Sequence, residues 1–149
     1  MKKLLFLALF ALSMARITAQ TDIKISPVAL LFETVAISVE SAVSENFGLD
    51  VEGILNTEIL GFNLSGKYYF NPKRRIDGFH VGAFVGNFGG EESVGLGFLA
   101  GTKILSRKNI LFEIGAGLGR SFDDGVVAYG KLHIGYRFGK KANVEEAPK

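Results

Sequence analysis

The chain has 149 residues, which is enough for one domain, with no cysteine and a formal net charge of +2. The lack of cysteine excludes a disulfide framework, and the nearly balanced charge excludes the basic surface of a nucleic-acid-binding protein. The composition, with 19 glycines and 13 phenylalanines in a chain that is 48% hydrophobic, is more typical of a membrane β-barrel than of a secreted globular domain.

The first 19 residues have the layout of a secretory signal peptide. Lys2-Lys3 is basic, Leu4–Leu12 is an uninterrupted apolar run, and Ile17-Thr18-Ala19 approximates a cleavage site of small residues. The apolar run is too short to span a bilayer as a helix. We therefore expect cleavage after Ala19 or Gln20, and a mature domain over residues 20–138.

Eight runs of alternating apolar and polar residues follow, and each predicts a β-strand. Turn residues such as Asn71-Pro72 separate them. Eleven residues at about 3.3 Å each, tilted by about 45°, rise roughly 25 Å, which is the height of the apolar band of an outer-membrane barrel. The runs are Asp22–Phe32, Thr34–Ala42, Phe47–Leu55, Leu60–Phe70, Gly78–Phe88, Ser93–Leu105, Ile110–Ser121 and Val126–Phe138.

Pro27 lies inside the first of these runs. Proline has no N–H group to donate to a neighbouring strand. We therefore expect a β-bulge or late pairing at this position.

Within the strands, charged side chains occupy one parity and large apolar side chains the other. Arg120, near the end of its strand, is the exception. A sheet with this pattern has one charged face and one apolar face. The charged residues on the shared parity are Lys24, Glu40, Asp50, Glu52, Lys67, Lys103, Glu113, Lys131 and Arg137.

Glycine indicates which face points inward. The interior of an eight-stranded barrel has room for few large side chains, so glycine beside long charged residues fits a packed lumen. The sequence thus predicts an all-β protein, an eight-stranded antiparallel up-and-down transmembrane β-barrel whose apolar face meets lipid. The glycines on the charged parity are Gly48, Gly61, Gly82, Gly86, Gly95, Gly97, Gly101, Gly115, Gly117, Gly119 and Gly135.

Aromatic residues agree with this orientation. They lie on the apolar parity next to one rim, as an interfacial girdle does. An even number of strands brings both termini to that rim, which we expect to be periplasmic. The girdle residues are Phe47, Phe70, Phe79, Phe112 and Phe138.

The lumen charges must be paired to be tolerated inside the barrel. We expect Lys103 directly opposite Glu113, with Lys131 one strand further on. Glu40 would face Asp50, and both would need a cation from Lys67 or Lys24. Such a network fills the lumen structurally or, alternatively, forms a gated polar path.

Two histidines, His80 and His133, also point into the predicted lumen. A metal site needs three or four ligands of defined geometry, and neither HxH nor HxxxH occurs. A hydrolase would need a nucleophile, a base and its orienting residue at one rim. We expect a structural role for both histidines, no cofactor and no enzymatic activity.

The sequence resembles the small outer-membrane barrels common in the Bacteroidota, which are similar in architecture to OmpA and OmpW. The resemblance implies an eight-stranded barrel inserted by the outer-membrane assembly machinery, with Tyr136 and Phe138 in the terminal recognition strand. It implies outer-membrane lipids and lipopolysaccharide as partners. The residues that carry it are Ile25–Phe32, Lys67-Tyr68-Tyr69-Phe70-Asn71, Gly78-Phe79-His80-Val81-Gly82 and Gly135-Tyr136-Arg137-Phe138.

The two ends of the predicted barrel differ in charge. The loops at one end are acidic, near Glu33, Glu58, Glu91-Glu92 and Asp123-Asp124. We expect these loops either to form a charged, solvated rim or to bind divalent cations shared with lipopolysaccharide. The other rim carries Lys73-Arg74-Arg75 and Arg107-Lys108, and a disordered periplasmic tail is expected over residues 139–149.

Three functions remain open from the sequence. The leading one is a structural or accessory barrel of the cell envelope. The second, which the resemblance to OmpW suggests, is a narrow pore or a conduit for small molecules. The third is a soluble periplasmic carrier similar to a lipocalin, with the apolar face inside.

Overall fold

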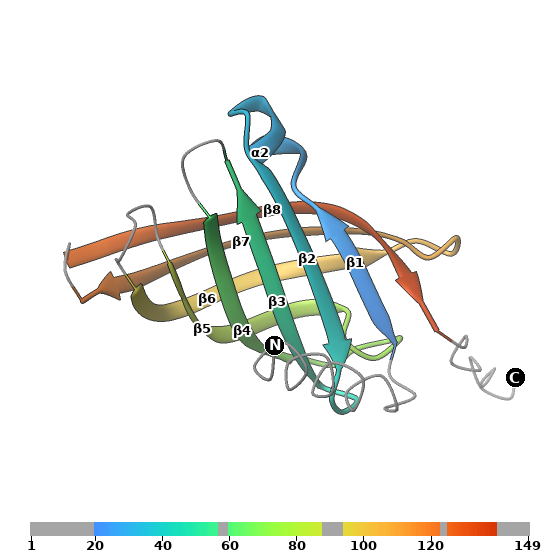
Figure 1. Cartoon of the computed structure of the whole chain (residues 1–149). Helices are drawn as coiled ribbons and strands as arrows, with labels where there is room; N and C mark the ends of the chain where they lie inside the picture. The colour runs from blue at the N-terminus through green and yellow to red at the C-terminus, as the bar shows by residue number, and fades with distance from the viewer. Residues whose placement is uncertain (1–19, 57–59, 88–93, 123–124, 140–149) are drawn as a thin grey trace, which may run out of the picture.

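The protein folds as a closed barrel of eight antiparallel strands. The computed structural model describes residues 20–56, 60–87, 94–122 and 125–139. Each strand pairs with the next along the chain, and β8 closes the barrel against β1 (Figure 1). The strands are β1 (Thr21–Ile25), β2 (Val35–Ala42), β3 (Phe47–Leu55), β4 (Leu60–Tyr69), β5 (Gly78–Asn87), β6 (Val94–Leu105), β7 (Ile110–Ser121) and β8 (Gly125–Phe138).

The predicted all-β, up-and-down barrel is therefore confirmed, and strands β2 to β8 lie within one residue of their predicted bounds wherever the structure describes them. Among the described residues, no helix is long and apolar enough to cross a membrane. The predicted signal peptide, residues 140–149 of the predicted tail, and the acidic positions Glu58, Glu91-Glu92 and Asp123-Asp124 lie outside the described residues.

The first strand is shorter than predicted. It ends at Ile25, and residues Pro27–Leu31 form a short helix, α2, in place of the expected bulge. Ser26 is its N-cap, because the Ser26 Oγ accepts a hydrogen bond from the Ala29 N–H. Pro27 occupies the first helical position, where a missing N–H costs nothing. Ser26 and Pro27 thus start a helix, although the alternating pattern of this run predicted that the strand would continue.

The charged parity faces the lumen and the apolar parity faces outward, as predicted. Glu40 and Glu113 are fully buried, whereas the exposed fractions of Phe98 and Leu118 are 74% and 66%. Arg120 is the only charged residue on the outward face of the eight strands. The barrel thus has a charged interior and an apolar exterior.

The two ends of the barrel differ. We call the end where β1 begins and β8 ends the terminal rim, because Thr21 pairs with Phe138 there. The helix α2 lies at the other end, the opposite rim (Figure 1). The predicted girdle phenylalanines are exposed on the outer face next to the terminal rim. Their exposed fractions run from 37% for Phe47 and Phe112 to 53% for Phe79.

The β4–β5 connection, residues 70–77, closes the terminal rim. Ile76 is fully buried and packs in a small apolar cluster with Ala42 and Tyr69. The Arg137 guanidinium donates to the carbonyl oxygens of Arg74 and Ile76, at 2.7 and 3.0 Å. The segment is therefore fixed to the end of the barrel.

Lumen glycines allow both tight strand contacts and packing of large side chains. A Cβ atom at Gly97 would lie 2.5 Å from the Gly119 Cα and 2.6 Å from the Phe84 Cζ. By contrast, a Cβ atom at the outward-facing Gly130 would meet nothing within 4 Å.

We expect Gly97→Val to destabilise the barrel by about 1–3 kcal/mol, because the new side chain overpacks the lumen. Gly130→Val is the matched control, since it adds the same side chain to an open position on the outer face. The free energies of unfolding are compared by urea titration of the barrel in lipid vesicles. An equal cost for the two variants would contradict the packing described here.

Candidate functional site: the lumen ion-pair network

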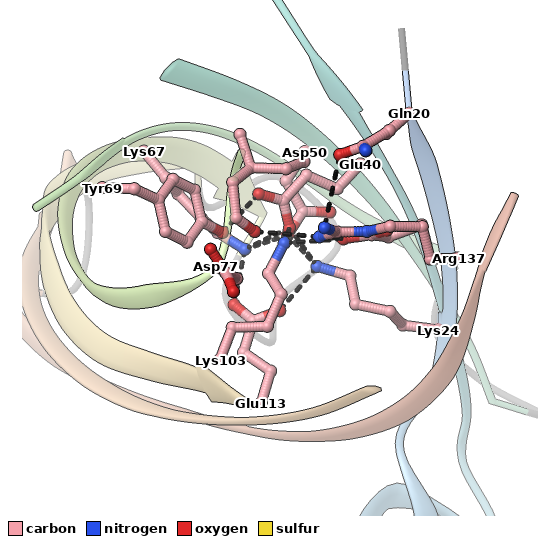
Figure 2. Close-up of polar contacts among 12 residues, drawn as sticks. Gln20, Lys24, Glu40, Asp50, Lys67, Tyr69, Asp77, Lys103, Glu113 and Arg137 are labelled. Carbon is pink, nitrogen blue, oxygen red and sulfur yellow. Dashed lines mark hydrogen bonds and ion pairs between the residues drawn. The ribbon is translucent and has the colours of Figure 1, made fainter. Parts of the chain in front are cut away.

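The network is built by alternate residues of seven strands, which project toward the barrel axis from all sides. Figure 2 shows their charged groups meeting near the centre of the lumen. Five carboxylates and five cations take part, so their formal charges cancel. They are Asp22, Glu40, Asp50, Glu52 and Glu113, with Lys24, Lys67, Lys103, Lys131 and Arg137.

Three carboxylates and two lysines form its centre. The Lys24 Nζ lies 2.6, 2.9 and 2.6 Å from carboxylate oxygens of Glu40, Asp50 and Glu113. The Lys67 Nζ lies 3.1, 2.5 and 2.5 Å from the same three residues. Every one of these side chains is fully buried. Glu40 does lie directly opposite Asp50, and both expected lysines hold the pair.

This centre also meets the geometric condition for binding a metal ion. One ligand atom each from Glu40, Asp50 and Glu113 lies within 4.8 Å of the others. The two lysine ammonium groups already lie among these oxygens, where a cation would otherwise be required. The arrangement is thus an internally neutralised charge cluster rather than an open coordination site.

A second group lies nearer the terminal rim. The Arg137 guanidinium holds the Asp22 carboxylate with two parallel bonds, Nε to Oδ1 at 2.6 Å and Nη2 to Oδ2 at 2.8 Å. The Lys103 Nζ joins Asp22 to the centre, at 2.8 Å from Asp22 Oδ2 and 2.8 Å from Glu40 Oε2. The Tyr69 hydroxyl donates to Glu40. The network therefore extends to the closed rim.

The expected pairing of Lys103 with Glu113 is only partly correct. Their Cα atoms are direct partners in the β6–β7 register, as predicted. However, the Lys103 ammonium group binds Asp22 and Glu40 instead, and Glu113 binds Lys24 and Lys67. In a narrow closed barrel a long side chain reaches across the axis, where several carboxylates compete with its neighbour.

A third group lies on the side of the opposite rim. Lys131 lies 2.5 Å from Asp50, which also accepts a hydrogen bond from Ser38. Glu52 accepts a hydrogen bond from the Tyr129 hydroxyl at 2.7 Å, and the His133 Nε2 lies 2.9 Å from its other oxygen.

Both histidines are buried in the lumen, as predicted. The His80 Nε2 lies 3.5 Å from Glu113. Neither ring nitrogen of His133 makes a hydrogen bond of good geometry to the described residues, despite its short distance to Glu52. The two rings contact different carboxylates, Glu113 and Glu52, so they do not form one histidine pair.

An aromatic layer lies above the network, toward the opposite rim. Phe84 is almost fully buried, and its ring lies 4.8 Å from the Tyr129 ring between centroids. Leu99 is also buried on this side. The lumen is thus filled by two stacked layers, one charged and one aromatic.

Sequence reasoning missed Asp22, Tyr69 and the inserted Ile76. Asp22 and Tyr69 share the lumen parity of Lys24 and Lys67, so a strict application of the alternating pattern would have found them. Ile76 lies in a connection, where no period applies. Tyr136 and Phe138 are exposed on the outer face of β8 with their rings 4.9 Å apart.

Comparison with models of protein families, with curated protein sequences and with solved structures finds no match to this chain. Any statement about function therefore depends on the geometry of the barrel and its lumen.

A double-mutant cycle tests the observed pairing. We expect a coupling energy of about 1–3 kcal/mol between Lys103→Met and Asp22→Asn, because their side chains are in contact. The coupling between Lys103→Met and Glu113→Gln should be smaller, since these side chains bind other partners. Both couplings are obtained from urea unfolding of the single and double variants. A larger value for the second pair would contradict the network described here.

Proposed function

We propose that this protein is a non-enzymatic barrel of a bacterial outer membrane, with a structural or accessory role in the cell envelope. The observation that carries the proposal is the inverted distribution of polarity. The lumen holds the charged groups, and the outer face of the strands carries one charged residue, Arg120. In a closed barrel the backbone N–H and C=O groups of each strand are paired with those of its two neighbours. Because its outer face is also apolar, such a barrel can face lipid.

The aromatic girdle supports the same orientation. Exposed phenylalanine and tyrosine gather next to the terminal rim, where an interface between lipid and water would lie. In this proposal the terminal rim is periplasmic, and outer-membrane lipids and lipopolysaccharide surround the barrel. The resemblance to small Bacteroidota barrels gives the same placement, with insertion by the assembly machinery through the strand that ends at Phe138.

The alternative carrier function has less support. A lipocalin-like carrier encloses its apolar ligand in the barrel. Here Lys24, Glu40 and Lys67 occupy the lumen, and they are fully buried.

Membrane fractionation tests the location. We expect the protein in the outer-membrane fraction, with a gel band that changes mobility when the sample is boiled, because a closed barrel resists detergent until heated. A soluble periplasmic protein whose band does not shift would overturn the proposal and favour the carrier.

Conductance measurements in planar bilayers test the alternative pore function. We expect no discrete openings for the native chain, because the charged layer and the aromatic layer both fill the lumen. Phe84→Ala should also remain closed, since it removes one ring of the aromatic layer and leaves the ion-pair network in place. Discrete openings of the native protein would instead support a narrow pore.

A further inference from the structure

A basic pocket lies on the terminal rim. It has a volume of about 470 Å³ and lies between the β2–β3 turn, at Glu45 and Asn46, and the β4–β5 connection, at residues 72–75. Lys73 and Arg75 are exposed there, and their side chains make no hydrogen bond or ion pair with the described part of the chain. Glu45 is the one acidic residue of the lining, so the pocket is positively charged overall.

The pocket is built on rigid backbone. The Arg74 N–H donates to the Asp77 carboxylate at 2.9 Å, and the Arg74 guanidinium donates to the carbonyl oxygens of Leu105 and Ser106. On the other wall, the Asn46 Nδ2 donates to the Tyr69 carbonyl oxygen at 3.1 Å. Arg74 is thus engaged in holding the loop, and Lys73 and Arg75 remain available for a ligand.

An apolar groove lies on the outer face of the barrel. Its volume is about 1080 Å³, and it crosses strands β4 to β8. Its depth comes from small outward residues in neighbouring strands: Ala100 pairs directly with Ala116, and Gly66 with Ala83. Its walls are large residues, among them Phe47, Phe98 and Leu118.

The pocket and the groove meet at the aromatic girdle. Asn46 lines the basic pocket, and the next residue, Phe47, lines the groove. The Phe47 ring lies over Gly66, because a Cβ atom there would be 3.0 Å from the Phe47 Cζ. On the other side, Tyr68 lines the groove and packs edge-on against Phe70, two residues before Pro72 of the pocket.

We infer that the groove and the pocket together bind one anionic phospholipid of the leaflet that meets the terminal rim. One acyl chain lies in the groove, and the phosphate group pairs with Lys73 and Arg75. This inference rests on the proposed function, because only an inserted barrel presents its outer groove to acyl chains. Charge complementarity selects the occupant, since a groove without a cationic end would accept any apolar chain.

Native mass spectrometry of the full chain, released from detergent after incubation with defined lipids, tests the inference. We expect one phosphatidylglycerol to be retained in preference to zwitterionic phosphatidylcholine of the same chain length. The double substitution Lys73→Gln with Arg75→Gln should weaken retention by at least about tenfold, because it removes both cations that pair with the phosphate. Glu45→Gln should strengthen it, because a carboxylate opposes the phosphate.

Matched controls separate this site from general attraction to a basic rim. Arg107→Gln with Lys108→Gln removes two cations from the neighbouring β6–β7 turn, which lies outside the pocket, and should leave retention unchanged. Ala100→Phe fills the groove and should reduce retention, whereas Val39→Phe enlarges an outward residue of β2 outside the groove and should not. Each variant is first checked for the heat-dependent gel shift, so that only folded barrels are compared.

Two results would overturn the inference. Equal losses from the pocket and the control charges would indicate non-specific electrostatic attraction. Equal binding of glycerol phosphate, which has no acyl chain, would indicate a free-phosphate site with no part for the groove. Either result would leave the membrane barrel intact, whereas failure of the proposed function would appear earlier, as a soluble protein without a gel shift.

Discussion

The barrel depends on the mutual neutralisation of charges that its closure buries. Glu40, Asp50 and Glu113 meet inside a space that excludes water, and Lys24 and Lys67 each contact all three. Breaking a buried ion pair by removing one partner costs about 3–5 kcal/mol, because the remaining charge is left uncompensated. The five strands that supply these groups are thus bound to one another across the lumen as well as along their edges.

Glycine makes this interior possible. Ten long or acidic side chains fit within eight strands only because much of the remaining inner wall has no side chain, as at Gly97 and Gly119. Because these glycines have no side chain, the lumen also has room for a second layer, which Phe84 and Tyr129 form. The result is a filled barrel, in which the lumen contributes stability and the outer face and the rims are the surfaces open to partners.

The sequence predicted much of the fold, because a period of two defines both the strands and their faces. All nine predicted lumen charges are buried, and the registers of Glu40 with Asp50 and Lys103 with Glu113 follow from short turns. It failed at Pro27, where local capping by Ser26 prevails over periodicity, and in the β4–β5 connection, where no pattern predicts the insertion of Ile76.

The sequence by itself determined the number of strands, the parity of each residue and the inward direction of the charges, since these follow from local alternation and from the small volume of an eight-stranded lumen. Only the tertiary structure decided which charges pair. Long side chains such as Lys103 reach past their register partners to carboxylates on distant strands, and these distances arise only when β8 closes against β1. The rim pocket and the outer groove likewise belong to the tertiary structure, because each is lined by residues of separate elements that lie side by side only in the folded sheet.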